Sequence, residues 1–295
     1  MKVLITGGAG FIGGHLALHL ESKGYDVLAV DNLERASMIN ALRGAKIRLI
    51  VADLRDLQEL PPADVIVHAA AYIDVAESFE EPYKYVVNNA AVTAKIAKAA
   101  YERGAHVIYI SSAAVYGEPH SIPVSEDHPA NPISLYGLSK WMGEEVIAFY
   151  GRMGAEYTII RPFNVYGPCQ SKAYSGVILK FVERARQGLP PVIYGGGEQV
   201  RDFIHVRDLA KFIQIVIDKK KVGVFNAGTG EGITINKLAR LVMDLAGITG
   251  SPVYEPPRRG DIKRSVADIR RALELGWSPS VKIEEGLREL LEKEC

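Results

Sequence analysis

Short runs rich in valine and isoleucine alternate with longer amphipathic segments along the chain. Seven of these runs read as strands: "KVLITG", "DVLAVD", "IRLIVAD", "DVIVHAA", "HVIYISS", "YTIIRP" and "GVFNAG". The runs are apolar at successive positions, so both faces of each strand are expected to be buried, and most of the intervening segments show helical periodicity. The pattern predicts an α/β protein with a doubly wound parallel sheet covered by helices on both sides.

A change of pattern from about residue 165 indicates a second, smaller lobe. Prolines and glycines become frequent, as in "GLPPVIYGGGE" and "SPVYEPPRRGD", and the regular alternation ends. The segment "FIHVRDLAKFIQIVID" still reads as a helix suited to the sheet. We therefore expect a larger domain of residues 1–165 plus about 200–230, interleaved with a smaller α/β domain of residues 166–199 and 231–295.

Composition and charge restrict the partners of the chain. Its 295 residues are 48% hydrophobic, and 35 basic residues balance 35 acidic ones, so no net field attracts nucleic acid or an anionic membrane. No apolar run approaches the roughly 18 residues of a membrane span, and the start lacks a signal-peptide hydrophobic region. The distant cysteines, Cys169 and Cys295, argue against a disulfide scaffold. We expect a cytoplasmic protein.

A glycine-rich segment, "GGAGFIGGH", lies between the first predicted strand and the first helix. Gly7, Gly10 and Gly13 recur at every third position, which permits a tight turn and close approach of a pyrophosphate to a helix N-terminus. Asp31 ends the second strand, where a carboxylate can bind both hydroxyls of an adenosine ribose. These features predict a dinucleotide-binding Rossmann domain. Asp31 favours NAD because it repels the extra phosphate of NADP, whereas the nearby Arg35 is an opposing signal.

"YGLSK" places Tyr136 and Lys140 four positions apart on a predicted helix, so both side chains can reach one pocket. A nearby ammonium favours the phenolate form, which makes tyrosine a usable general base. Ser112, near the end of the fifth predicted strand, can share a hydrogen bond with the same substrate oxygen. An isolated pair at this spacing would be an ordinary surface feature, but the upstream dinucleotide pattern favours catalysis.

The order of "GGAGFIGGH", "HAAA", "SSAAVYG", "YGLSK", "RPFNVYGP" and "RDFIHVRDLA" resembles the extended short-chain dehydrogenase/reductase family. Within that family the chain is most similar to the UDP-glucose (UDP-galactose) 4-epimerases. The resemblance implies NAD-dependent 4-epimerisation of UDP-sugars through a transient 4-keto intermediate. It also implies that Tyr136 is the base, that Lys140 lowers the pKa of Tyr136 and binds the nicotinamide ribose, and that Ser112 positions the sugar hydroxyl.

The resemblance also implies a set of binding residues. Asn164 would hold a diphosphate or sugar oxygen, Arg201 and Arg258 would clamp the diphosphate, and residues 192–194 would line the uracil. A salt bridge with the adjacent Asp202 or with another residue of the smaller lobe is the structural alternative for Arg201. A turn cap is the alternative to adenine binding for Asp53. The expected cofactor residues are Gly7, Gly10, Phe11, Ile12, Gly13, Asp31, Asn32, Asp53, Leu54, Ala69, Ala70, Asn88, Tyr136 and Lys140, and the substrate residues are Ser112, Tyr136, Asn164, Val192, Ile193, Tyr194, Arg201, Arg258 and Ser265.

Other reactions of the family remain as alternatives. Related dehydratases carry acidic residues in the strand-end segment, where this chain has the two alanines of "SSAAVYG". Elimination is therefore disfavoured, and the main alternative is another NAD(P)-dependent nucleotide-sugar reductase or dehydratase. His15 and His19 have the spacing of zinc ligands, but the segment between them lacks the glutamate of a metalloprotease motif, so we expect packing roles and no metal.

Two further expectations concern assembly and substrate breadth. The helix starting near Leu135 and the segment of about residues 89–102 have apolar positions that could form a four-helix bundle in a homodimer, as the resemblance implies. In the resembling epimerases, a tyrosine four positions beyond the aspartate of "GD" restricts the pocket to glucose and galactose. This chain has Ser265 there. The smaller residue predicts that UDP-GlcNAc and UDP-GalNAc are accepted too.

Overall fold

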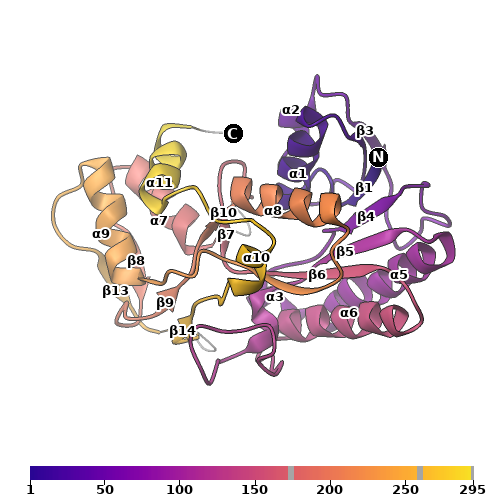
Figure 1. The fold of residues 1–295 in the computed structure, drawn as a ribbon. Coiled ribbons are helices and arrows are strands. Elements are labelled where there is room, and N and C mark those ends of the chain that lie inside the picture. Colours follow the sequence, from indigo (N-terminus) through magenta and orange to yellow (C-terminus); the bar gives the residue numbers. More distant parts are fainter. Residues whose placement is uncertain (172–175, 258–261, 294–295) are drawn as a thin grey trace.

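The computed structural model describes residues 1–171, 176–257 and 262–293. Its largest sheet contains seven strands in the order β11-β6-β5-β4-β1-β2-β3, and every neighbouring pair is parallel (Figure 1). The predicted doubly wound sheet is therefore confirmed. The strands are β1 (Lys2–Thr6), β2 (Asp26–Asp31), β3 (Arg48–Val51), β4 (Val65–His68), β5 (His106–Ile110), β6 (Tyr157–Pro162) and β11 (Gly223–Ala227).

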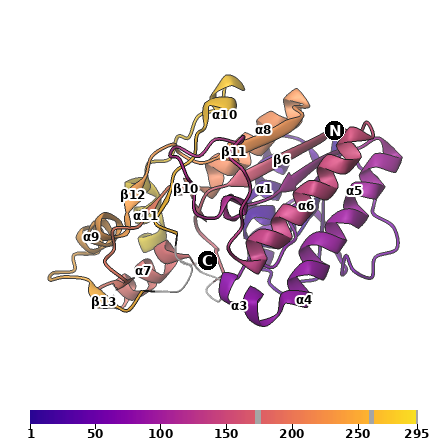
Figure 2. The same ribbon diagram turned by 90° about the horizontal axis from the view of Figure 1, so that it is seen from below.

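Helices cover both faces of the sheet. The helices α1 (Phe11–Ser22) and α8 (Val206–Lys219) pack together on one face, and α5 (Val92–Arg103) and α6 (Leu135–Arg152) pack side by side on the other (Figure 2). The shorter helices of this domain are α2 (Ile39–Leu42), α3 (Val75–Glu80) and α4 (Pro82–Tyr85). Helical crossovers between parallel strands produce this three-layer arrangement.

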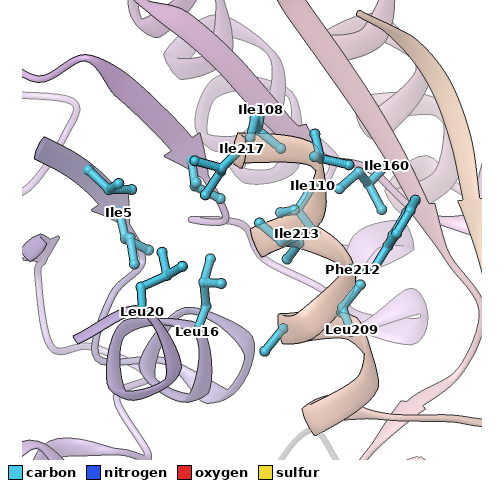
Figure 3. Close-up of a cluster of buried hydrophobic side chains, with 14 of the residues drawn as sticks. Ile5, Leu16, Leu20, Ile108, Ile110, Ile160, Leu209, Phe212, Ile213 and Ile217 are labelled. Atoms are coloured by element: carbon cyan, nitrogen blue, oxygen red, sulfur yellow. The ribbon is translucent and has the colours of Figure 1, made fainter. Parts of the chain in front are cut away.

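The two core layers follow from the alternation of side chains along each strand. Val3 and Ile5 of β1 face α1 and α8, whereas Leu4 belongs to the cluster beneath α5 and α6. All three are completely buried. Figure 3 shows the first cluster, in which Ile213 and Ile217 of α8 meet the strands. Because both faces of the inner strands are buried, these strands are mostly apolar, whereas the edge strand β3 is partly exposed.

The smaller lobe has its own core. Side chains of α7 (Val177–Arg186), α9 (Ile235–Ala246) and α11 (Ile283–Glu292) pack around Ile193. The strands β8 (Val192–Tyr194) and β13 (Val253–Glu255) pair there in parallel. The remaining short strands are β7 (Val165–Tyr166), β9 (Val200–Arg201), β10 (Ile204–His205), β12 (Ile233–Thr234) and β14 (Arg264–Ser265).

The boundary between the lobes is less regular than the sequence suggests. Ala272 of α10 (Arg270–Glu274) and the following Trp277 are buried in the core of the large domain. The indole Nε1 of Trp277 donates to the carbonyl of Asp208 in α8 at 3.1 Å. Part of the segment 231–295, which we assigned to the smaller domain, thus completes the larger one.

One expectation about the cysteines is wrong: Cys169 is disulfide-bonded. The cysteines therefore give no support to the expected cytoplasmic location. Within the described ranges, no helix is long and apolar enough to cross a bilayer.

The two histidines of α1 have hydrogen-bond partners. Nε2 of His15 lies 2.9 Å from the carbonyl oxygen of Pro168, and Nε2 of His19 lies 2.7 Å from the side-chain oxygen of Gln214.

Candidate active site

A pocket opens at the carboxyl ends of β1, β2 and β4. Successive strands run outward from β1 in one direction through β2 and β3 and in the other from β4, so the chain changes direction across the sheet between β1 and β4. Dinucleotides bind at such switch points in doubly wound sheets. All twelve residues that we assigned to the cofactor outside the "YGLSK" helix line this pocket: Gly7, Gly10, Phe11, Ile12, Gly13, Asp31, Asn32, Asp53, Leu54, Ala69, Ala70 and Asn88. Glu34, Tyr72 and Gln170 also line it, although the sequence analysis did not single them out.

The glycines form a backbone cradle with no room for side chains. A Cβ at Gly13 would lie 2.1 Å from the carbonyl oxygen of Gly7, and a Cβ at Gly7 would lie 2.7 Å from the backbone nitrogen of Ala70. Gly7 also has a φ of +69°, which L side chains rarely adopt. The following α1 begins after Gly10 without a side-chain cap. Its first N–H groups can therefore bind the diphosphate of NAD, so the residues present fit this cofactor.

The acidic residues at the strand ends are held in place by backbone groups. The carboxylate of Asp31 accepts hydrogen bonds from the N–H groups of Ala9 at 3.0 Å and Leu33 at 2.8 Å. The carboxylate of Asp53 accepts from the backbone and the guanidinium of Arg55, and these bonds lower the pKa of Asp53 strongly. Asp53 thus has its alternative role as a turn cap, and adenine binding stays a prediction.

Tyr136 and Lys140 lie on the first turns of α6, whose N-cap Ser134 accepts a hydrogen bond from the N–H of Gly137. Burial raises the pKa of Tyr136 above its ordinary value, and the interaction with Ser112 offsets only part of this rise. Lys140 is 2% exposed, and its Nζ lies 4.3 Å from the centre of the Tyr109 ring. The serine and tyrosine are therefore together as expected, and the effect of Lys140 on the pKa of Tyr136 stays a prediction.

A buried ion pair anchors α6, and sequence reasoning did not find it. Glu144 of α6 pairs with Arg161 of β6 at 2.6 Å, and both side chains are almost completely buried. Glu144 also accepts a hydrogen bond from Ser111 at 2.5 Å. Burial lowers the pKa of Lys140 to about 7, while the charge of Glu144 acts to raise it. The spacing of Tyr136, Lys140 and Glu144 at every fourth position was the available signal.

The segment that carries Asn88 is a π-helical turn of residues 86–91 ahead of α5, so this helix begins later than we expected. Asn88 points to the cofactor pocket, whereas the neighbouring Asn89 is buried. The Asn89 side chain donates to the carbonyl of Tyr72 and to Ser139 of α6. The irregular turn thus gives adjacent asparagines different roles, as is common for π-bulges at functional sites.

Three predicted substrate residues meet around Asp202. Asn164 donates to the carbonyl of Asp202 at 2.7 Å, and the N–H of Asp202 donates to the carbonyl of Ser265 at 3.0 Å. Arg201 pairs with Ser265 between β9 and β14. The Asp202 carboxylate instead accepts hydrogen bonds from Thr229 and from backbone N–H groups of other residues. Its role is therefore to bind these groups and not to form the alternative salt bridge with Arg201.

One of the three residues of the expected uracil site is not accessible. Ile193 is completely buried in the core of the smaller lobe, so its side chain cannot line a base. Val192 and Tyr194 are partly exposed on the same strand, and their role stays a prediction. Arg258, the second expected diphosphate ligand, lies outside the described residues.

The switch-point pocket, the glycine cradle and the Ser–Tyr–Lys group define a dinucleotide-dependent enzyme of the extended short-chain dehydrogenase/reductase type. Residues 3–228 match the family model described as the NAD dependent epimerase/dehydratase family, and the chain belongs to this family. A UDP-glucose 4-epimerase of Mycolicibacterium smegmatis is 35% identical over 99% of this chain and 98% of its own length.

Solved structures agree with this assignment. A UDP-glucose 4-epimerase of Thermotoga maritima with UDP-glucose has a TM-score of 0.93 at 35% identity, covering 99% of this chain and 98% of the other. A UDP-N-acetylglucosamine 4-epimerase of Methanobrevibacter ruminantium M1, in complex with UDP-N-acetylmuramic acid, has a TM-score of 0.92 at 36% identity, covering 99% and 97%. The fold and family are thus established over nearly the whole length.

Proposed function

We propose that the chain is an NAD-dependent 4-epimerase of UDP-sugars that acts on UDP-galactose and UDP-glucose. The observation that carries the proposal is that Tyr136 lies close enough to Ser112 to be affected by it, on the helix α6. This helix packs against the turn of residues 86–91, which carries the pocket residue Asn88. Ala113 and Ala114 follow Ser112 in a short 3₁₀ helix, where a dehydratase would need acidic groups. The family and the epimerases with similar structures support the same reaction.

The residues of the chain have separate tasks in this reaction. Tyr136 takes the proton from the sugar 4-hydroxyl, and it returns this proton after the 4-keto sugar has rotated in the pocket to present its opposite face. Ser112 holds the reacting oxygen beside the phenol, and Lys140 binds the nicotinamide ribose. Bound NAD supplies the hydride acceptor and donor. Asn164 and Arg201, with Arg258, would hold the diphosphate, a task suited to guanidinium groups.

Tyr136→Phe tests the proposal. It removes one hydroxyl, so we expect folding and NAD binding to persist and epimerisation to fall by a factor on the order of a hundred or more. NMR of UDP-galactose incubations measures the conversion, and mass spectrometry of the purified protein identifies bound nucleotide. Tyr150→Phe, about 20 Å along the same helix, is the matched control and should retain activity. Near-normal activity in Tyr136→Phe would refute the assigned base.

The alternative reactions leave different products. A reductase would consume NADH in proportion to product, and a dehydratase would form a keto-deoxy sugar. Either product pattern, observed with wild-type protein, would replace the epimerase proposal.

Substrate breadth is proposed to depend on Ser265. This residue is buried in β14 and pairs with Arg201, a proposed diphosphate ligand, so a tyrosine in its place would need space that the serine leaves free. We expect the wild type to interconvert UDP-GlcNAc and UDP-GalNAc as well as the unmodified pair. Ser265→Tyr should selectively suppress the acetylated substrates. Equal loss on both substrate pairs would show that Ser265 is not the selective residue.

A homodimer is proposed from the apolar surface of α6. Four apolar residues there are each between 37% and 52% exposed: Leu138, Met142 and Phe149 of this helix, which packs beside α5, and its C-cap Met153. Light scattering should give twice the chain mass of 32.2 kDa at micromolar concentration. Phe149→Asp should shift the protein towards monomer, whereas the control Leu189→Asp, at an exposed leucine outside α5 and α6, should not.

A cytoplasmic location stays a proposal, which cell fractionation tests.

A further inference from the structure

Two opposed charges lie in the wall of the cofactor pocket, and together they bear on the choice between NAD and NADP. Asp31 and Arg35 both line the pocket. A carboxylate at the end of the second strand favours the free ribose of NAD, whereas an arginine nearby can accommodate the 2′-phosphate of NADP. The preference of the chain therefore depends on where the guanidinium of Arg35 is directed.

The structure directs Arg35 to Glu77. The Nη2 of Arg35 lies 2.8 Å and 2.7 Å from the two carboxylate oxygens of Glu77. The guanidinium also lies 4.3 Å from the centre of the Tyr72 ring, and the Arg35 side chain is only 16% exposed. Stacking and pairing thus hold the cation in the wall of the pocket.

Glu77 is itself firmly placed. It lies in the first turn of α3, where its N–H donates to the N-cap Asp74 at 2.9 Å. Its carboxylate also accepts from Lys84 at 2.9 Å and from Tyr85 at 2.8 Å. Burial raises the pKa of Glu77, but the hydrogen bonds from Arg35, Lys84 and Tyr85 outweigh burial and lower it to about 2. Glu77 is therefore ionised at neutral pH.

We propose that Glu77 is a residue that determines cofactor specificity: by pairing with Arg35 it withholds this cation from a 2′-phosphate. Asp31 is then the charge that meets the adenosine ribose, and NAD is selected. This inference rests on the proposed use of NAD, and it adds a second determinant to Asp31. Removal of Glu77 alone leaves the repulsion by Asp31, so full acceptance of NADP requires both changes.

The test measures binding, and it does not depend on turnover. Nucleotide-free wild type, Glu77→Gln, Asp31→Asn and the double variant are titrated with NADH and NADPH, and nicotinamide fluorescence reports the two dissociation constants. A charge-assisted hydrogen bond to a phosphate corresponds to a change of roughly 10-fold or more in affinity. We expect Glu77→Gln to shift the preference towards NADPH by about that factor, and the double variant to shift it by roughly 100-fold or more.

Glu34→Gln is the matched control. Glu34 lines the same pocket and accepts a hydrogen bond from the hydroxyl of Tyr72 at 2.6 Å, so its removal changes the net charge equally without releasing Arg35 from Glu77. Addition of Arg35→Met to the double variant should abolish the gain. If Glu77→Gln does not bind NADH, Glu77→Asp takes its place, because its shorter side chain also separates the pair.

Three results would overturn the inference: no gain of NADPH affinity in the double variant, an equal gain in Glu34→Gln, or a gain that persists with Arg35→Met. A wild type that binds NADPH as tightly as NADH would instead refute the proposed use of NAD. The failure of the inference and the failure of the proposed function are therefore distinguishable.

Discussion

Arg161→Met should destabilise the protein more than an ordinary core substitution, because it breaks a buried ion pair. Arg161 donates to both carboxylate oxygens of Glu144 and also to Tyr116 and the carbonyl of Glu126. After the substitution Glu144, which is 2% exposed, retains only Ser111 as a hydrogen-bond donor among these groups. An unpaired buried charge of this kind costs about 3–5 kcal/mol.

Urea unfolding followed by circular dichroism, at one protein concentration, measures the loss. We expect the free energy of unfolding to fall by about 3–5 kcal/mol at neutral pH. The double variant Arg161→Met/Glu144→Met should recover most of the loss, since it removes both charges. A loss below about 1 kcal/mol in the single variant, or a double variant less stable than the single, would refute this reasoning.

Three further predictions concern titration and the cofactor cradle. Burial lowers the pKa of Lys140 to about 7, so between about pH 7 and pH 10 the unfolded chain binds more protons than the folded chain. The stability of the wild type relative to Lys140→Met should therefore rise across this window by at most about 1.4 kcal/mol per pH unit. Burial, with a smaller effect of the Lys140 charge, lowers the pKa of His68 to about 3. The wild type should therefore lose stability relative to His68→Gln as the pH falls below about 6.5, and acid unfolding of both proteins measures this difference. Gly13→Ala should weaken NADH binding by roughly 10-fold or more in a fluorescence titration, because its Cβ would meet the Gly7 carbonyl. Gly176→Ala should not, because a Cβ there would meet no atom of the described residues within 4 Å.

Much of the architecture could be predicted because its signals are local. Each strand of the large sheet coincides with a run of apolar residues, since burial on both faces requires apolar side chains at successive positions. The glycine cradle could be recognised because a tight turn and a close backbone approach require Gly7 and Gly13 themselves. Tyr136 and Lys140 could be paired because the helical repeat alone brings them to one face.

The tertiary structure decided which distant residues share a site. Glu144 meets Ser111 and Arg161 across 33 and 17 positions of sequence, and Arg35 meets Glu77 across 42. No local period links such residues, because their contact depends on the strand order and on how α3 and α6 pack beside the sheet. The same packing buried Ile193 and moved Trp277 into the larger core. The sequence by itself therefore determined the fold class and the glycine cradle, because their signals are local, whereas the packing of distant elements decided which charges and partners surround the candidate site.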